Sequence, residues 1–299
     1  MVKSSNFKKI LIGVSGGPDS MLLLYESLQK YGSQNIVVAC VNYNVRENTH
    51  LEVKIVRDFC IKNNIIFALK NLDKNIYKKG NFENWARFVR YDFYKQLVNL
   101  YNLDVVFLAH HKDDFIESYF MQKNSNRKCF FYGIKQENFI NGIKIFRPFI
   151  NKYFKKEILE ICKLKDIHYA IDPSNNLNLY TRNKIRNSLK DIPLEEKEQI
   201  YNDILEINRN SDFYAVNKLY KSWQNHNFSQ EFFVESDKKD RLVYMFIHKN
   251  YKDINLSSSK INSIIDWIVS NKNRTSKYLI KKDIYLIKIK GKLFCSYMK

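Results

Sequence analysis

Several features that define large protein classes are missing from this sequence of 299 residues. Its five cysteines are odd in number and include no C-x-x-C pair, which argues against a disulfide framework, a zinc ribbon or a cysteine-held iron–sulfur cluster. No apolar run approaches the 18 residues of a membrane span, and the first residues lack a signal-peptide pattern. These absences predict a cytoplasmic protein without a membrane partner.

Acidic residues are scarce relative to basic ones, with 31 Asp and Glu against 50 Lys and Arg, so the net charge is +19. Such an excess usually accompanies a polyanion, either nucleic acid or an anionic membrane surface. A compositional bias towards lysine is the alternative explanation. A hydrophobic fraction of 45% is ample for a buried core and excludes a disordered chain.

Short β-branched runs alternate with amphipathic patterns over the first part of the chain. Strands are expected at 9–14, 35–44, 65–72 and 104–109, and helices at 19–32, 49–64 and 84–99. This alternation predicts an α/β fold, a Rossmann-like parallel sheet with helices on both faces. Ligands of such folds bind beyond the carboxyl ends of the strands.

The pattern changes near Pro193 to long helical segments, and then to short strands around a turn at Lys290 and Gly291. The sequence therefore predicts three parts, namely an α/β domain over residues 1–190, a helical connector over 191–215 and a small C-terminal domain over 216–299.

The loop Ser15-Gly16-Gly17-Pro18-Asp19-Ser20 lies between the first strand and its helix. Two glycines permit a tight turn, and the N-terminus of the following helix favours an anion, so the loop suits a phosphate. It is neither a Walker A loop nor a Rossmann fingerprint. A glycine-rich turn with simple helix capping is the alternative.

The segment from His110 to Ser118 follows the strand at 104–109. If a helix begins near His111, Asp114 and Glu117 share one face. Two neighbouring carboxylates can hold a cationic amine or Mg²⁺, whereas the ligand spacing of a zinc site is missing. The alternative is that these acids only favour a helix start.

SGGPDS resembles the PP-loop of the ATP pyrophosphatases, which split ATP between its α and β phosphates. Over roughly residues 9–190 the chain also resembles tRNA(Ile)-lysidine synthases, with similar motifs in the same order. These are VNYNVR with a downstream Glu52, NFENWARFVRY, HHKDDFIES, FRPFI and IDPSNNLNLYTRNKIR. PP-loop relatives that thiolate RNA commonly need cysteine pairs, which are missing here.

The resemblance implies that ATP adenylates C2–O of the wobble cytidine in a CAU-anticodon isoleucine tRNA, and that free L-lysine then displaces AMP to form lysidine. ATP with Mg²⁺ is the expected cofactor set. By position, the ATP-binding residues are Ser15, Gly16, Gly17, Pro18, Asp19, Ser20 and Arg90. Asp114 and Glu117 would bind lysine, and the catalytic set is Asp19, Arg87, His111, Asp114 and Glu117.

A basic stretch from Lys123 to Lys165 carries eleven Lys or Arg against three Glu, with interleaved aromatic residues. Such a stretch suits a tRNA backbone, although charge runs are more often solvated faces. The tRNA-binding candidates are Lys123, Arg127, Lys128, Arg147, Arg182 and Arg186. The C-terminal domain is also expected to contact tRNA, and the oligomeric state stays open, with a homodimer as one option.

The chain departs from the family pattern at three positions of its motifs. Tyr43 stands where the family usually has His, Phe115 where it has Gln, and Ser118 where it has Thr. KNSNRKC replaces a glycine-rich segment, and the chain looks like a short form without the last C-terminal domain. Two other functions stay open, namely a PP-loop adenylating ligase or amidotransferase acting on a small molecule, and a tRNA-binding protein with a relict nucleotide site.

Overall fold

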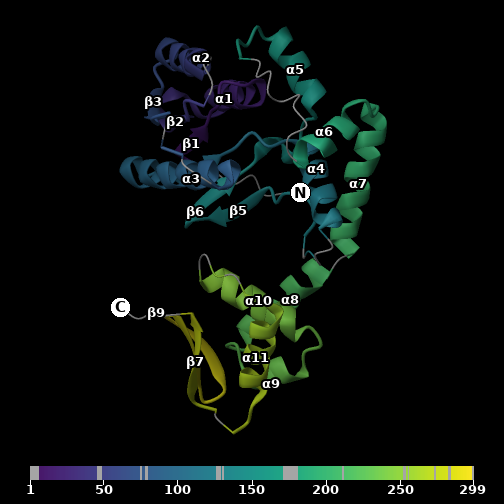
Figure 1. The fold of residues 1–299 in the computed structure, drawn as a ribbon. Coiled ribbons are helices and arrows are strands. Elements are labelled where there is room, and N and C mark those ends of the chain that lie inside the picture. The colour runs from purple at the N-terminus through teal and green to yellow at the C-terminus, as the bar shows by residue number, and fades with distance from the viewer. Residues whose placement is uncertain are drawn as a thin grey trace. The chain divides into compact units, whose positions relative to one another are not determined.

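The computed structural model describes residues 7–45, 49–74, 76–77, 80–125, 129, 131–170, 181–210, 212–251, 254, 256–272, 274–281 and 284–297. Side chains of 181–183, 212–214 and 295–297 lie outside this description. The chain divides into two compact units, Met1–Glu206 and Ile207–Lys299, and each is described by itself (Figure 1). The boundary between the units lies after Glu206, and the division into three parts stays a prediction.

The first unit is built on a six-stranded sheet in the order β3-β2-β1-β4-β6-β5. The strands are β1 (Ile10–Gly13), β2 (Ile36–Asn42), β3 (Ile66–Asn71), β4 (Val105–Phe107), β5 (Glu137–Ile140) and β6 (Ile143–Phe146). All neighbours pair in parallel except β5 with β6. The predicted α/β class with a parallel sheet is confirmed, and the antiparallel edge strand is an addition that the sequence pattern did not predict.

Helices cover both faces of this sheet because the strand side chains alternate between two cores. Ile10 and Ile12 of β1 face a core with α1, α2 and α5, whereas Leu11 between them faces a core with α3. The helices of the unit are α1 (Pro18–Tyr31), α2 (Thr49–Lys62), α3 (Phe82–Tyr101), α4 (Lys112–Asn124), α5 (Lys155–Leu164), α6 (Thr181–Lys190) and α7 (Leu194–Asn210). Short 3₁₀ turns lie at Ser33–Asn35 and Pro148–Asn151.

A third cluster packs α4 against α6 and the first turns of α7. Phe115 and Ile116 of α4 meet Ile185 of α6 and Tyr201 of α7 in one buried group. The C-terminal residues of α7 after Glu206 belong to the second unit. The start of α7 therefore packs within the first unit, which also contains the predicted phosphate-binding loop at Ser15–Ser20.

The second unit packs helices against a three-stranded antiparallel sheet in the order β7-β8-β9. Its elements are α8 (Asp212–Asn225), α9 (Gln230–Glu235), α10 (Lys239–Asn250), α11 (Ser258–Val269), β7 (Ser276–Lys281), β8 (Ile284–Ile289) and β9 (Lys292–Tyr297). Trp223 and Phe233 are fully buried in its core. The predicted short strands around Lys290 and Gly291 are present, and both residues have positive φ angles.

None of the described helices combines the length and apolar character that a membrane crossing requires. The helix that comes nearest in length is α3, with 20 residues, and charged side chains interrupt its sequence.

Candidate active site

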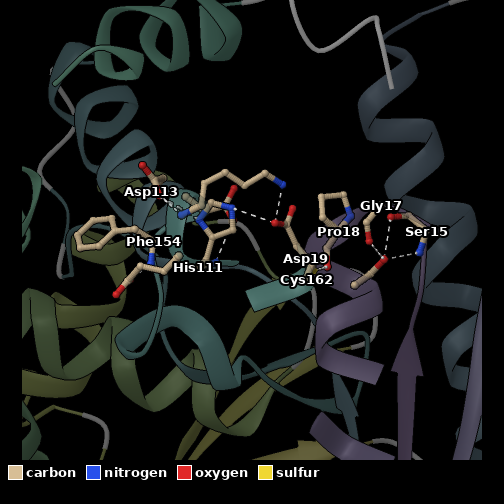
Figure 2. A network of polar contacts seen from close by, with 12 residues as sticks. Ser15, Gly17, Pro18, Asp19, His111, Asp113, Phe154 and Cys162 are labelled. Atoms are coloured by element: carbon tan, nitrogen blue, oxygen red, sulfur yellow. Dashed lines mark hydrogen bonds and ion pairs between the residues drawn. The ribbon is translucent and has the colours of Figure 1, made fainter. Parts of the chain in front are cut away.

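The predicted phosphate loop joins β1 to α1, which starts at Pro18 with Gly17 as its N-cap. Ser20 fixes the turn, because its hydroxyl accepts a hydrogen bond from the Ser15 amide at 3.1 Å and donates one to the Gly17 carbonyl at 3.0 Å (Figure 2). No side chain caps the helix start. The N-terminus of α1 therefore presents its amides and its dipole towards the carboxyl edge of the sheet, as an anion site requires.

Gly16 is required by both backbone conformation and space. Its φ angle is +87°, and a Cβ atom there would lie 2.9 Å from the carbonyl oxygen of Glu52 in α2. The Gly16 carbonyl also accepts a hydrogen bond from the Ala170 amide at 2.9 Å. The loop is thus held between α2 and the segment after α5.

A cleft of about 450 Å³ opens beside this loop, over the carboxyl ends of the central strands. Of the residues predicted for the site, seven line the cleft, namely Ser15, Asp19, Ser20, Arg87, Arg90, Asp114 and Arg186. Sequence reasoning missed Glu83, which also lines it from the first turn of α3. The fold thus brings the loop, the two α3 arginines and one of the two predicted carboxylates into one opening.

Asp114 caps the start of α4 by accepting a hydrogen bond from the His111 backbone. The His111 amide donates to Oδ2 of Asp114 at 3.0 Å, and both side chains are buried. The His111 ring has Nε2 at 3.5 Å from Asp114 Oδ2 and at 3.9 Å from Asp19 Oδ1, and Nδ1 at 3.4 Å from Asp113 Oδ2. His111 therefore lies between the phosphate-type loop and the acidic start of α4 (Figure 2).

These carboxylates control the charge of the His111 ring. Burial lowers the pKa of His111, but the charges of Asp114, Asp113 and Asp19 outweigh burial and raise that pKa from 6.5 to about 8. Burial raises the pKa of Asp113, yet the neighbouring His111 ring, the Lys155 amide and the Lys197 ammonium outweigh burial and keep that pKa well below its usual range. His111 is consequently mainly protonated at neutral pH.

Lys155 is a site residue that sequence reasoning placed only in a general basic stretch. Its ammonium lies 2.6 Å from Oδ1 of Asp19, and its amide donates to Oδ2 of Asp113 at 2.7 Å. Lys155 and Asp19 are separated in sequence by 136 residues. A cation within hydrogen-bond distance of the loop aspartate offers a further contact for a polyphosphate.

Glu117 is almost fully buried and is bonded by an arginine from another helix. Arg186 of α6 donates from Nε to Oε1 of Glu117 at 2.7 Å and from a terminal nitrogen to Oε2 at 3.2 Å. The same guanidinium lies 3.8 Å from Asp114. Arg186, predicted as a tRNA contact, thus lies in the cleft against the two carboxylates predicted for lysine.

The basic stretch between Lys123 and Lys165 does not form one open surface. Arg147 is 3% exposed, and one of its nitrogens donates at 2.8 Å to both the Lys135 carbonyl and the Asn138 side chain. Its guanidinium therefore supports the β5–β6 region, so its assignment to tRNA contact is not retained. Lys123 is exposed at the end of α4, while Arg127, Lys128 and the Arg182 side chain lie outside the described residues.

Two departures from the family pattern have structural roles. Tyr43 lines the cleft and donates its hydroxyl to the Ala86 carbonyl at 3.0 Å. Phe115 is 2% exposed and lies so close to Gly133 that a Cβ there would be 2.4 Å from its ring. An apolar side chain at 115 therefore belongs to the α4 core rather than to the cleft.

Comparison with known proteins defines the class first. The PP-loop domain model matches residues 1–192. A U34-tRNA thiolase, NcsA from Methanococcus maripaludis, matches with a TM-score of 0.54 at 20% identity and covers 68% of this chain and 73% of that chain. The first unit therefore has the PP-loop fold, and the loop at Ser15–Ser20 is its signature.

Relatives that match nearly the whole chain then identify the family within the PP-loop class. A tRNA(Ile)-lysidine synthase of Mycoplasmopsis pulmonis is 44% identical, with 94% of this chain and 96% of the relative covered. That of Mesomycoplasma hyopneumoniae is 33% identical, with 98% and 97% covered. That of Ureaplasma parvum is 35% identical, with 93% and 84% covered. The chain belongs to the tRNA(Ile)-lysidine synthase family, and the resemblance seen in the sequence is confirmed.

Proposed function

We propose that this protein ligates free L-lysine to C2 of the wobble cytidine in the CAU-anticodon isoleucine tRNA, consuming ATP and releasing AMP and pyrophosphate. The observation that carries the proposal is the shared cleft, in which the PP-loop at Ser15–Ser20, the arginines of α3 and Asp114 meet. An adenylating ligase needs a phosphate site and a nucleophile site that face the same reacting carbon. The cytoplasm, where tRNA, ATP and free lysine occur together, is the proposed location.

The phosphates of ATP are assigned to the loop. Ser15, Gly16, Gly17, Pro18 and Ser20 supply the turn and the start of α1, and Asp19 faces the same space with Lys155 beside it. Arg90 and Arg87 lie across the cleft, where guanidinium groups would stabilise the charge that develops on the α-phosphate as pyrophosphate leaves.

The lysine substrate is assigned to Asp114 and Glu117. Both carboxylates are buried at the start of α4, and a buried carboxylate attracts an ammonium group strongly. Arg186 already bonds Glu117 and approaches Asp114. The substrate ammonium would therefore share these carboxylates with Arg186, and the α-carboxylate of lysine would find a partner in the same guanidinium.

The chemistry takes two steps in the one cleft. The cytidine O2 attacks the α-phosphorus and expels pyrophosphate, which leaves AMP joined to C2 through O2. The neutral ε-amine of lysine then attacks C2, the C2–O2 bond breaks, AMP leaves with that oxygen, and the amine nitrogen releases a proton to solvent. We assign His111, whose ring lies 3.5 Å from Asp114 and whose pKa is raised by the surrounding carboxylates, the role of stabilising the anionic phosphate.

Mg²⁺ is proposed to enter with ATP. Among the described residues, no group of three or more His, Cys, Asp or Glu side chains is arranged as a metal site. Mg²⁺ typically keeps several waters and takes most other ligands from substrate phosphates, so it fits this cleft as part of the nucleotide complex. It would neutralise phosphate charge, and no protein ligand is assigned.

The tRNA is proposed to contact Lys123 at the end of α4, together with Arg127, Lys128, Arg182 and parts of the second unit. These contacts would serve the phosphate backbone and would be sensitive to salt. A homodimer remains a hypothesis.

The experiment that tests the proposal is AMP release from ATP with and without each partner. AMP should form at an appreciable rate only when CAU-anticodon isoleucine tRNA is present, and free lysine should be needed to complete the turnover. AMP release that is equally fast without tRNA would contradict the proposal and would favour a small-molecule ligase.

A further inference from the structure

The first turn of α7 is joined to the first turn of α4 by two adjacent ion pairs. Lys197 Nζ lies 2.9 Å from Asp113 Oδ1, and Glu198 Oε2 lies 2.7 Å from Lys112 Nζ. Two consecutive residues of α7 thus bind two consecutive residues of α4. The Lys197 and Asp113 side chains are only 14% and 12% exposed, whereas the Glu198 side chain is 43% exposed.

The two pairs differ in what lies behind them. Asp113 continues into the candidate active site, because its other oxygen accepts the Lys155 amide at 2.7 Å and lies 3.4 Å from His111 Nδ1. Lys112 instead stands over the rings of Phe154 and Tyr201, 4.8 and 5.1 Å from their centroids. The Lys112 pair therefore packs against aromatic rings only. The Lys197 pair, in contrast, is connected through Asp113 to the His111 imidazole, which lies between Asp19 and Asp114.

Docking of α7 alone does not explain a buried lysine at 197. Removing an ammonium and a carboxylate from water costs free energy that their attraction often only balances, so an apolar residue would anchor the helix at least as well. The helix already has apolar anchors in Tyr201 and Ile204. A function for the charge of Lys197 is therefore sought in its effect on Asp113.

We propose that Lys197 is a positioning residue for His111: it holds the Asp113 carboxylate from the far side, so that the imidazole stays between the PP-loop aspartate and Asp114. Lys197 lies after residue 192, where the match to the PP-loop domain ends. The site is thus completed by α7, from outside the matched domain. The catalytic consequence rests on the proposed function, whereas the geometric one does not.

Charged groups from five helices surround His111, and each influences the pKa of its ring. They are Asp19 of α1, Asp113 and Asp114 of α4, Lys155 of α5 through Asp19 and Asp113, Arg186 of α6 through Asp114, and Lys197 of α7 through Asp113. Replacing Lys197 by the neutral Met removes one of the cations that offset the carboxylates, so the protonated ring becomes more stable. Asp113 keeps its bond from the Lys155 amide to Oδ2, so its charge stays near the ring, but Oδ1 loses the contact that fixes the carboxylate.

The direct test follows the His111 ring by NMR titration in the full-length protein. The chain has six histidines, and the His111 signal is the one lost in His111→Asn. In Lys197→Met the titration midpoint should rise by about one pH unit, and in Lys197→Arg it should return close to that of the unchanged protein. Glu198→Gln is the matched control, because it breaks the neighbouring pair on the same helix turn and should leave the midpoint in place.

An unchanged midpoint in Lys197→Met, or an equal shift in Glu198→Gln, would overturn the proposal and leave both pairs as helix anchors. Turnover gives a second reading. Lys197→Met should lower kcat roughly tenfold with the KM for tRNA unchanged, as expected when a reacting geometry loosens. An unchanged kcat in an active enzyme would also contradict it. If the unchanged protein ligates no lysine, the function is refuted while the NMR test still decides the positioning.

Discussion

Buried charges are arranged in opposite ways in the two units. In the first unit, buried or half-buried cations and carboxylates from α1, α4, α5, α6 and α7 pair with one another and converge on the cleft. In the second unit, Lys288 is the one fully buried charged side chain among the residues that the structure describes. Its ammonium donates to the carbonyls of Trp267, Ile268 and Ser270 at the end of α11.

The difference shows which buried charge is functional and which is structural. An ammonium on the last carbonyls of a helix satisfies groups that the helix itself leaves unpaired, and it favours the helix dipole. Carboxylates clustered around an imidazole beside a phosphate-binding loop repel one another, and such clusters with shifted pKa values are typical of functional sites. Substitutions should therefore separate activity from stability according to the unit in which they lie.

Asp19→Ala should give the largest effect. Asp19 faces the cleft and bonds Lys155 at 2.6 Å, so its loss should lower the rate of tRNA-dependent AMP release by roughly 100-fold or more. The measurement is AMP formation, with the melting temperature as control. A variant that releases AMP at the normal rate would remove Asp19 from the site.

Asp114→Asn should mainly affect lysine. The amide keeps the shape of the side chain but loses the charge that attracts an ammonium, so the apparent KM for lysine should rise by about tenfold or more. ATP binding, followed by calorimetry, should change little. An unchanged lysine KM would refute the assignment.

Lys288→Met should destabilise the second unit without touching the chemistry. The carbonyls of Trp267 and Ile268 would lose this donor, whereas that of Ser270 keeps a bond from Gln230, at a total cost of about 2 kcal/mol. Urea unfolding measures this, and Lys277→Met, at an exposed position of β7, is the matched control. Equal stability of the two variants would mean that the buried ammonium contributes nothing.

The raised pKa of His111 predicts a pH dependence of stability. The pKa in the folded protein is about 8 against 6.5, so the stabilisation of up to about 2 kcal/mol is complete below pH 6.5 and is lost as pH rises through 8. The free energy of unfolding should be higher in the unchanged protein than in His111→Asn, and this difference should be larger at pH 6 than at pH 9 by about that amount. A pH-independent difference would contradict the charged environment.

Lys123→Ala should give the smallest effect. Removal of one phosphate contact should weaken tRNA binding by no more than a few fold and reduce the slope of log affinity against log salt by about one. Binding in a salt series measures both. A slope equal to that of the unchanged protein would place Lys123 outside the tRNA contact.

Local pattern was enough to predict the parts of the site that are contiguous in sequence. The strand, glycine-rich turn and helix around Ser15–Ser20 follow from residue types, as does the helix start at His111. The β5–β6 hairpin was missed although the sequence contains its usual signal, the pair Asn141-Gly142. In the structure both residues have the positive φ angles of a tight hairpin turn.

The contacts that were missed join residues far apart in the chain. Lys155 contacts Asp19, and Lys197 contacts Asp113, only because α5 and α7 pack beside α4. A single sequence does not reveal how these helices pack. Arg147 was misassigned for the same reason, because a basic residue in a charged stretch looks exposed until β5 covers it. Charge predicts a partner only when burial is also known.

The central claim, that the cleft joins lysine to tRNA through an adenylate, is tested most directly by incorporation of labelled lysine. Purified protein with ATP should transfer label to the CAU-anticodon isoleucine tRNA, and to none of the same tRNA in which the wobble cytidine is replaced by uridine. Label in neither tRNA, with an active synthase from a relative as positive control, would contradict the account.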